Sequence, residues 1–207
     1  MIKIINKLFA KFNFGIVKIF PRHSTRFARR IFGNEPIIAI EIGTDKGRNA
    51  LSILKTLNIK KIYLVDPYED YEGRSKEEMS FAEIEAKKRL EKYKHKIIWI
   101  KKFSKDAIKD IPGEIDFIYI DGDHEDVKSD IENYYSKLKV GGILAGHDIT
   151  NPKYRKGIIK SLIDFSFQNN LLFEVSRTDW WIVKSPFTLK HSERLISEEA
   201  IKKYFEN

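Results

Sequence analysis

The segment Asp116-Phe-Ile-Tyr-Ile-Asp121-Gly-Asp-His124 joins an apolar run to a polar end. The run predicts a buried strand, and the glycine between two acids predicts a turn directly after it. In open α/β sheets, ligands bind at the carboxyl ends of the strands, because loops and helix N-termini converge there. A second segment, Gly146-His147-Asp148, ends a later apolar run in the same way. We therefore expect Asp121, His124 and Asp148 at one edge of the sheet, in an arrangement typical of an enzyme.

Short apolar runs alternate with helical patterns from residue 35 onward. The expected strands are 37–42, 61–65, 96–100, 115–120, 142–146, 171–176 and 180–184. The expected helices are 48–57, 75–93, 104–109, 127–138, 151–167 and 192–205. This alternation predicts right-handed βαβ units in an α/β fold, with a parallel sheet that helices cover on both faces. The last two expected strands would form a hairpin around residues 177–179.

The composition excludes several classes of protein. The chain has 207 residues, of which 42% are hydrophobic and 33% are charged, as in a globular domain. The absence of cysteine excludes disulfides, zinc–thiolate sites and cysteine nucleophiles. No apolar run approaches 18 residues, so no transmembrane helix is expected. Lysines interrupt the apolar residues near the N-terminus, which argues against a secretory signal, and we expect a cytoplasmic protein.

The net charge of +8 is concentrated in residues 1–34, which hold 8 basic residues and no acid. Because the rest of the chain is balanced, a specific nucleic-acid partner is not expected. Lys3, Lys7, Lys11 and Lys18 form one helical stripe, and apolar residues lie opposite. Such a helix could make peripheral contact with an anionic membrane surface, or it could pack on the domain or on a second subunit of a homo-oligomer. We expect residues 1–34 to be an extension of a domain at 35–207.

The first predicted strand leads into Glu41-Ile-Gly43-Thr-Asp-Lys-Gly47. A glycine at a strand end permits a tight turn and lets a ligand approach the backbone, while the next helix points its N-terminus at that ligand. Asp66 ends the second predicted strand, where an acid can accept hydrogen bonds from a ribose diol. A turn glycine and a helix-capping acid would explain each feature alone, but their combination favours a nucleotide-like cofactor.

These segments resemble class I S-adenosylmethionine (SAM)-dependent methyltransferases over about residues 36–184. The similarity is carried by 41–47, 65–68, 121–124 and 141–148. It is closest to the branch that contains macrolide-sugar O-methyltransferases and cephalosporin-hydroxylase-like proteins. One departure is Asp45, which stands where the commoner motif D/E-x-G-x-G-x-G often has a glycine.

The resemblance implies a Rossmann-like three-layer sandwich with a seven-stranded, mostly parallel sheet and an antiparallel last strand. It also implies SAM as the cofactor and assigns roles to individual residues. Glu41 and Gly43 would lie near the methionine part, Asp66 would hold the ribose hydroxyls, and Ser104 would lie in the adenine loop. The full set of implied cofactor-binding residues is Glu41, Gly43, Gly47, Asp66, Ser104 and Asp121.

A hydroxyl acceptor becomes a good nucleophile when a divalent cation lowers its pKa or a general base takes its proton. Asp121 and Asp148 offer hard oxygen ligands for Mg²⁺ or Mn²⁺, and His147 stands where the resembling sugar methyltransferases have another acid. Imidazole shifts the preference towards Mn²⁺, and the absence of any metal stays open. His124 matches the position of the base in that branch, although a loop histidine that caps the next helix is the alternative.

Three functions stay open at this point. The first is O-methylation of a small hydroxylated acceptor, such as a sugar. The second is N-methylation of RNA or of a small amine, although enzymes that methylate bases often carry Asn/Asp-Pro-Pro-aromatic where this chain has Asp-Gly-Asp-His. The third is a non-catalytic scaffold that binds a cofactor or a membrane.

Overall fold

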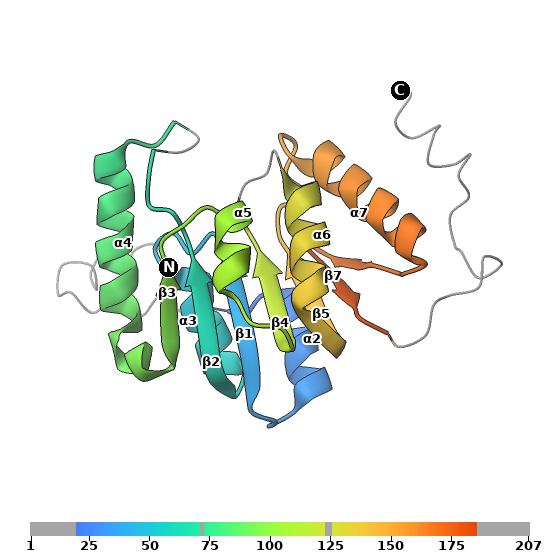
Figure 1. Ribbon diagram of the computed structural model, residues 1–207, viewed down its shortest axis with the longest axis horizontal. Coiled ribbons are helices and arrows are strands. Elements are labelled where there is room, and N and C mark those ends of the chain that lie inside the picture. The colour runs from blue at the N-terminus through green and yellow to red at the C-terminus, as the bar shows by residue number, and fades with distance from the viewer. Residues whose placement is uncertain (1–19, 71–72, 123–125, 186–207) are drawn as a thin grey trace, which may run out of the picture.

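The computed structural model describes residues 20–70, 73–122 and 126–185 (Figure 1). Seven strands form one sheet in the order β3-β2-β1-β4-β5-β7-β6. Their bounds are β1 Ile37–Ile42, β2 Ile59–Val65, β3 Ile97–Ile100, β4 Ile115–Ile120, β5 Leu138–Gly146, β6 Glu174–Ser176 and β7 Asp179–Val183. The first five strands are parallel, and β7 runs antiparallel to both β5 and β6. The predicted fold class is confirmed.

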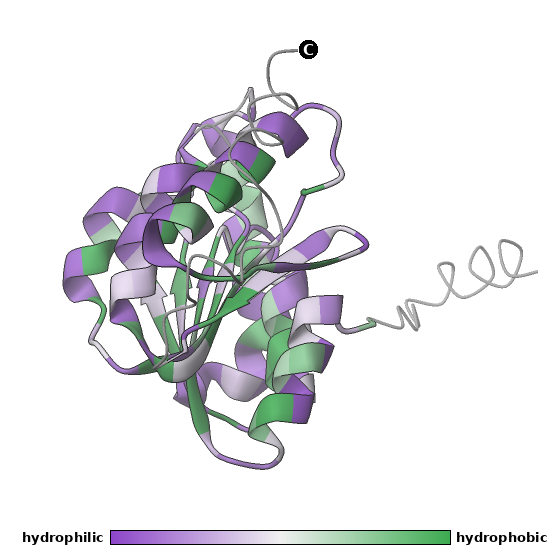
Figure 2. Cartoon of the chain, turned by 90° about the vertical axis from the view of Figure 1, so that its right-hand side faces the viewer, coloured by the Kyte–Doolittle hydropathy of each residue, from purple (hydrophilic) through white to green (hydrophobic). Residues whose placement is uncertain are grey.

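Helices cover both faces of this sheet. They are α2 His23–Phe32, α3 Arg48–Thr56, α4 Lys76–Leu90, α5 Ser104–Ala107, α6 Val127–Lys137 and α7 Arg155–Asn169, with short 3-10 turns at Glu91–Lys96 and Ile108–Asp110. The helices α5, α6 and α7 pack on one face, and α2, α3 and the end of α4 pack on the other (Figure 1). Figure 2 shows hydrophobic strands enclosed by helices with hydrophilic outer sides. Burial of apolar surface in these two layers is the main force that holds the sandwich together.

The closing hairpin shows how alternation along a strand serves both layers. Trp180 lies in the hydrophobic cluster of one face and Trp181 in that of the other, as the predicted strand requires. Trp181 stacks on Phe27 of α2 with 5.1 Å between ring centroids. The Trp180 ring crosses Gly146 so closely that a β-carbon there would lie 2.3 Å from a ring carbon. Glycine at 146 therefore lets the hairpin close against the end of β5.

Two predicted helix starts had different outcomes. The start predicted at residue 75 is confirmed, because Ser75 is the N-cap of α4 and forms a capping box: its hydroxyl accepts from the Glu78 amide, and the Glu78 carboxylate accepts from the Ser75 amide. The predicted start of α7 at residue 151 was wrong, because the helix begins at Arg155. The Asn151 side chain accepts from the Lys153 amide, so residues 151–154 form a separate turn. The predicted helix 192–205 lies outside the described residues.

The described part of the N-terminal extension packs on the domain through α2. Ala28 is fully buried, and Ser24 donates from its amide (3.0 Å) and its hydroxyl (2.6 Å) to the carboxylate of Asp179. Because α2 lacks a side-chain cap of its own, Asp179 supplies the negative charge that a helix N-terminus favours. The lysine stripe at residues 3–18 lies outside the described residues, so membrane contact stays a prediction. Among the described helices, none has the length and apolarity to cross a bilayer.

Candidate active site

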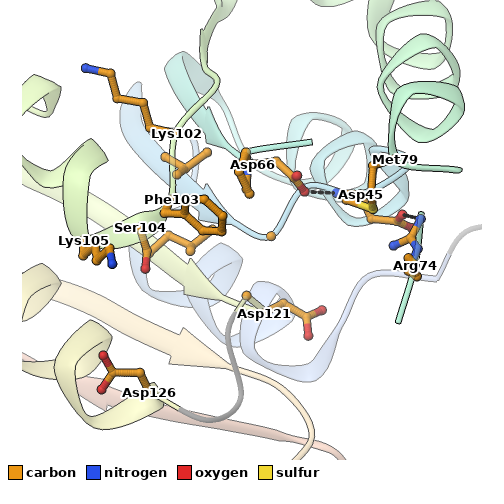
Figure 3. A pocket seen from close by; sticks show the side chains of 15 residues that line it. Asp45, Asp66, Arg74, Met79, Lys102, Phe103, Ser104, Lys105, Asp121 and Asp126 are labelled. Carbon is orange, nitrogen blue, oxygen red and sulfur yellow. Dashed lines mark hydrogen bonds and ion pairs between the residues drawn. The ribbon is translucent and has the colours of Figure 1, made fainter. Parts of the chain in front are cut away.

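A cavity of about 500 Å³ opens at the carboxyl ends of β1, β2 and β4 (Figure 3). This volume lies within the usual range of small-molecule and cofactor sites. Four of the predicted cofactor residues line it: Gly43, Asp66, Ser104 and Asp121. The rest of the wall comes mainly from Asp45, Arg74, Met79 and the segment 102–105 that follows β3. The structure thus brings residues from four separate loops to one place, as the sheet-edge argument requires.

Asp66 is held in a defined orientation at the end of β2. Its Oδ2 accepts from the Asp45 amide at 2.8 Å, and its Oδ1 accepts from the Tyr68 amide at 2.9 Å. Burial raises the pKa of Asp66, although the two backbone hydrogen bonds oppose that rise. A carboxylate has about four acceptor positions, so two of them are left for a ligand after the backbone contacts. The site therefore suits a ligand with paired hydroxyl groups.

Gly43 brings the turn after β1 against the turn after β4. Its φ of +82° lies in the left-handed region, and a β-carbon would lie 2.0 Å from the carbonyl oxygen of Asp121. Gly47 has a different setting, because it caps α3 and faces Ala86 and Leu90 of α4 rather than lining the cavity. Of the two predicted glycines, only Gly43 lies at the cavity wall.

Asp45 explains how the chain departs from the glycine-rich form of this turn. Asp45 itself adopts a positive φ of 44°. Its carbonyl oxygen accepts from the Tyr68 hydroxyl at 2.9 Å, and its carboxylate pairs with Arg74 at 2.8 Å. These contacts hold an aspartate in a backbone conformation that glycine adopts more readily. Sequence reasoning did not identify Arg74, whose partner is set by the fold.

Glu41 lies behind this wall, next to the last residue of β1. It is 1% exposed, and among the described residues its Oε2 has no hydrogen-bond partner. Burial raises the pKa of Glu41 well above its usual range, the Asn49 side chain opposes that rise, and the nearby carboxylates of Asp121 and Asp66 add to it. An unpaired buried acceptor is unfavourable, so the position suits a ligand that donates a hydrogen bond or carries positive charge.

Asp121, His147 and Asp148 form the second group of the site. Each offers one ligand atom, and these atoms all lie within 4.8 Å of one another. The Nδ1 atom of His147 lies 3.0 Å from an oxygen of Asp148 and 3.7 Å from Oδ1 of Asp121. The pairing of Ile120 with Gly146 places the ends of β4 and β5 side by side, which is why the group converges. Two carboxylates and an imidazole fit a divalent cation such as Mn²⁺.

Asp121 belongs to both parts of the site, because it lines the cavity and also contributes to the three-residue group. The predicted base, His124, lies outside the described residues, so its role stays a prediction. Apart from His124 and Gly47, all predicted site residues therefore lie in the wall of one cavity or beside it.

Arg22, at the N-cap of α2, is a residue of this site that the sequence did not point to. Its Nη2 atom lies 3.5 Å from Asp121 Oδ2, and its Nη1 atom lies 3.9 Å from Asp179 Oδ1. The guanidinium group also lies over the Tyr119 ring, 5.9 Å from its centroid. No local spacing could have identified this contact, because it joins the N-terminal extension to β4 and β7.

The sheet order and the cavity define a Rossmann-like α/β enzyme with a cofactor site at the switch point of its strands. Residues 40–149, more than half of the chain, match the model of a methyltransferase domain family. The chain therefore belongs to this methyltransferase domain family. A comparison with curated protein sequences gave no match.

Solved structures share this fold at low sequence identity. An O-methyltransferase from Bacillus cereus in complex with S-adenosylhomocysteine (SAH) has a TM-score of 0.63 and 14% identity, covering 88% of this chain and 90% of that one. The O-methyltransferase TomG from Streptomyces achromogenes, in complex with SAM, has a TM-score of 0.58 and 12% identity, and the match covers 88% of each chain. An rRNA methylase from Streptococcus thermophilus has a TM-score of 0.55 and 15% identity, and the match covers 77% of this chain and 91% of that one. At these identities the similarity concerns the fold.

Proposed function

We propose that the protein transfers the methyl group of SAM to a hydroxyl group of a small acceptor, such as a sugar. One observation carries this proposal: Asp121 lies both in the wall of the cavity and in the group with His147 and Asp148. A methyl donor in the cavity would thus lie next to side chains that can bind and activate an acceptor. Alignment of two reactants in this way supplies a large part of the rate enhancement of a group transfer.

Residues in the cavity wall, together with Glu41 behind it, offer each part of SAM a partner of suitable chemistry. Asp66 has the acceptor capacity for the two ribose hydroxyls, and the unpaired Oε2 of Glu41 suits the ammonium group of the methionine part. Gly43 lets the turn after β1 pack against the turn after β4 at the cavity wall, and Ser104 stands on the wall proposed for adenine. Gly47 would act indirectly, by holding the start of α3.

SAM, when bound, supplies an electrophilic methyl carbon on its sulfonium. The acceptor oxygen would take this methyl group, and the electron pair of the broken sulfur–carbon bond would stay on sulfur as SAM becomes SAH. The hydroxyl proton leaves to a base, for which we propose His124. Asp121, His147 and Asp148 would hold Mg²⁺ or Mn²⁺, and such a cation lowers the pKa of a bound hydroxyl.

Calorimetric titration of the purified protein with SAM tests the donor site. We expect micromolar affinity for the wild type and at least a tenfold loss for Asp66→Asn, because a neutral amide accepts fewer hydrogen bonds from the ribose. Asp70→Asn removes the same charge from the exposed loop that follows and should leave the affinity unchanged. Equal affinities in all three proteins would contradict the assignment of Asp66.

Assays with hydroxylated and amine acceptors test the second half of the proposal. We expect methylation of a hydroxyl group, loss of turnover in chelator and recovery with Mn²⁺ or Mg²⁺. Turnover that chelator does not affect would remove the metal from the proposal, and methylation of an amine or of RNA would replace the acceptor class. SAM binding without turnover on any acceptor would favour a scaffold.

A further inference from the structure

The N-terminal extension places a permanent positive charge inside the candidate active site. Arg22 contacts Asp121 at 3.5 Å, and Asp121 is one of the three residues that could hold a cation. Both side chains are largely shielded from solvent, with 29% of Arg22 and 21% of Asp121 exposed. An arginine cannot lose its charge at physiological pH, so its effect on Asp121 persists under all relevant conditions.

The fold holds Arg22 in this position. Asp179 anchors the first turn of α2 through the amide and hydroxyl of Ser24, and it is itself buried. The Tyr119 hydroxyl also donates to Asp179, at 3.5 Å. The guanidinium group of Arg22 therefore lies between Asp121 and Asp179, on an element that is tied to the sheet.

The distances indicate that Arg22 is shared between the two carboxylates. A charge-assisted hydrogen bond between a guanidinium and a carboxylate is about 2.7–2.9 Å long. The contacts of Arg22 with Asp121 (3.5 Å) and with Asp179 (3.9 Å) are both longer. Asp121 is also 3.7 Å from His147, on its other oxygen. One carboxylate thus faces a fixed cation with Oδ2 and the candidate metal group with Oδ1.

We propose that Arg22 competes with a divalent cation for Asp121 and thereby sets the affinity of the Asp121–His147–Asp148 group. A cation at this group and the guanidinium group repel each other across the same carboxylate. Binding of the cation shifts Arg22 towards Asp179, which keeps the guanidinium paired. The inference rests on the cation site of the proposed function, but it concerns the N-cap residue of α2, to which the proposed transfer assigns no role.

Titration of the SAM-free protein with Mn²⁺, followed by the paramagnetic resonance signal of the free ion, tests this inference without any activity assay. We expect Arg22→Met to bind Mn²⁺ about tenfold more tightly than the wild type. Arg22→Gln, which keeps polar contacts with both carboxylates, should show the same gain. Arg22→Lys, which keeps the charge, should stay close to the wild type.

Arg26→Met is the matched control, because Arg26 lies on the same helix and is exposed. It removes the same charge and should leave the Mn²⁺ affinity unchanged. Equal or weaker binding by both Arg22→Met and Arg22→Gln would overturn the inference, and so would an equal gain in Arg26→Met. If none of the proteins bound Mn²⁺, the inference and the proposed cation site would both fail, whereas SAM binding would be judged separately by calorimetry.

Discussion

The ends of β1 and β2 and the ends of β4 and β5 lie along the same edge of the sheet, but different interactions hold them. Near β1 and β2, most of the interactions involve the backbone. Asp66 accepts hydrogen bonds from two backbone amides, and Gly43 packs against the main chain of Asp121. Near β4 and β5, ionisable side chains from four separate segments of the chain meet at 3.0 to 3.9 Å, namely Arg22, Asp121, the neighbours His147 and Asp148, and Asp179.

This difference separates a part of the site that is preorganised from a part that can respond. Backbone hydrogen bonds and close main-chain packing leave little freedom, which suits a cofactor that every reaction cycle uses. Long contacts between charged groups change with each added charge, because Coulomb interactions depend on all neighbours at once. Substitutions that add bulk should therefore have the larger effect near β1 and β2, where we propose that the donor binds. Substitutions that change charge should have the larger effect near β4 and β5, where we propose that the acceptor binds.

The largest effect is expected for Gly43→Ala. The new β-carbon would lie 2.0 Å from the carbonyl oxygen of Asp121, so the two turns would have to separate. We expect a loss on the order of 3 kcal/mol in the free energy of unfolding, together with loss of SAM binding. Denaturant titration and calorimetry measure both quantities.

Gly73→Ala is a matched control, because Gly73 has nearly the same positive φ (80° against 82°) and no atom of the described residues lies within 4 Å of an added β-carbon. It should cost about 1 kcal/mol, which isolates the effect of the close approach. If the two variants lost equal stability, the packing of Gly43 against Asp121 would have no special role.

A smaller effect is expected for Asp179→Ala, which removes the carboxylate that caps α2 and faces Arg22. Since Ser24 donates twice to Asp179, we expect a loss of about 2 kcal/mol in the free energy of unfolding. Asp164→Ala removes an acid from an exposed i,i+4 pair with Lys160 and should change stability by about 0.5 kcal/mol or less. Similar losses in both variants, measured by denaturant titration, would mean that α2 does not depend on Asp179.

The smallest effect concerns Glu41 and depends on pH. Because its pKa is raised in the folded protein, the wild type loses stability as the pH rises from the unfolded value of about 4.3 towards the folded one. Glu41→Gln should therefore make the ligand-free protein more stable at neutral pH, and the gain should vanish below about pH 4. Its SAM affinity should fall, because an amide attracts an ammonium group less than a carboxylate does.

Glu83→Gln should change stability with pH in the opposite direction. Hydrogen bonds from Lys87 and Lys101 lower the pKa of Glu83, so its contribution to stability is present above the unfolded pKa and is lost as the pH falls. This variant should be no more stable than the wild type at neutral pH. Thermal melts of both variants from pH 4 to pH 8 measure the contrast; a Glu41→Gln variant that lost stability at neutral pH would contradict the account of Glu41.

The sequence predicted those features that local patterns encode. Continuous apolar runs predicted the strands. The glycine and acids at the ends of these runs predicted that Gly43, Asp66 and Asp121 lie in one site, because parallel strands bring such ends together. The start of α7 was missed because Asn151 can cap a helix or close a turn with its own backbone, and only the tertiary setting decides between the two.

Arg22 and Glu41 show what the sequence could not provide. The position of Arg22 beside Asp121 depends on how α2 docks on β4 and β7, a contact without any sequence spacing. Glu41 was identified by resemblance, but its unpaired oxygen and raised pKa follow from burial, which only the packed structure defines.

A crystal structure of the protein with SAH and Mn²⁺ tests most directly whether the cavity and the Asp121–His147–Asp148 group form one site. We expect SAH in the cavity with its ribose hydroxyls on Asp66, and an anomalous manganese peak bound by Asp121, His147 and Asp148. SAH bound elsewhere, or an Asp121 side chain that faces neither the ligand nor the ion, would contradict the account.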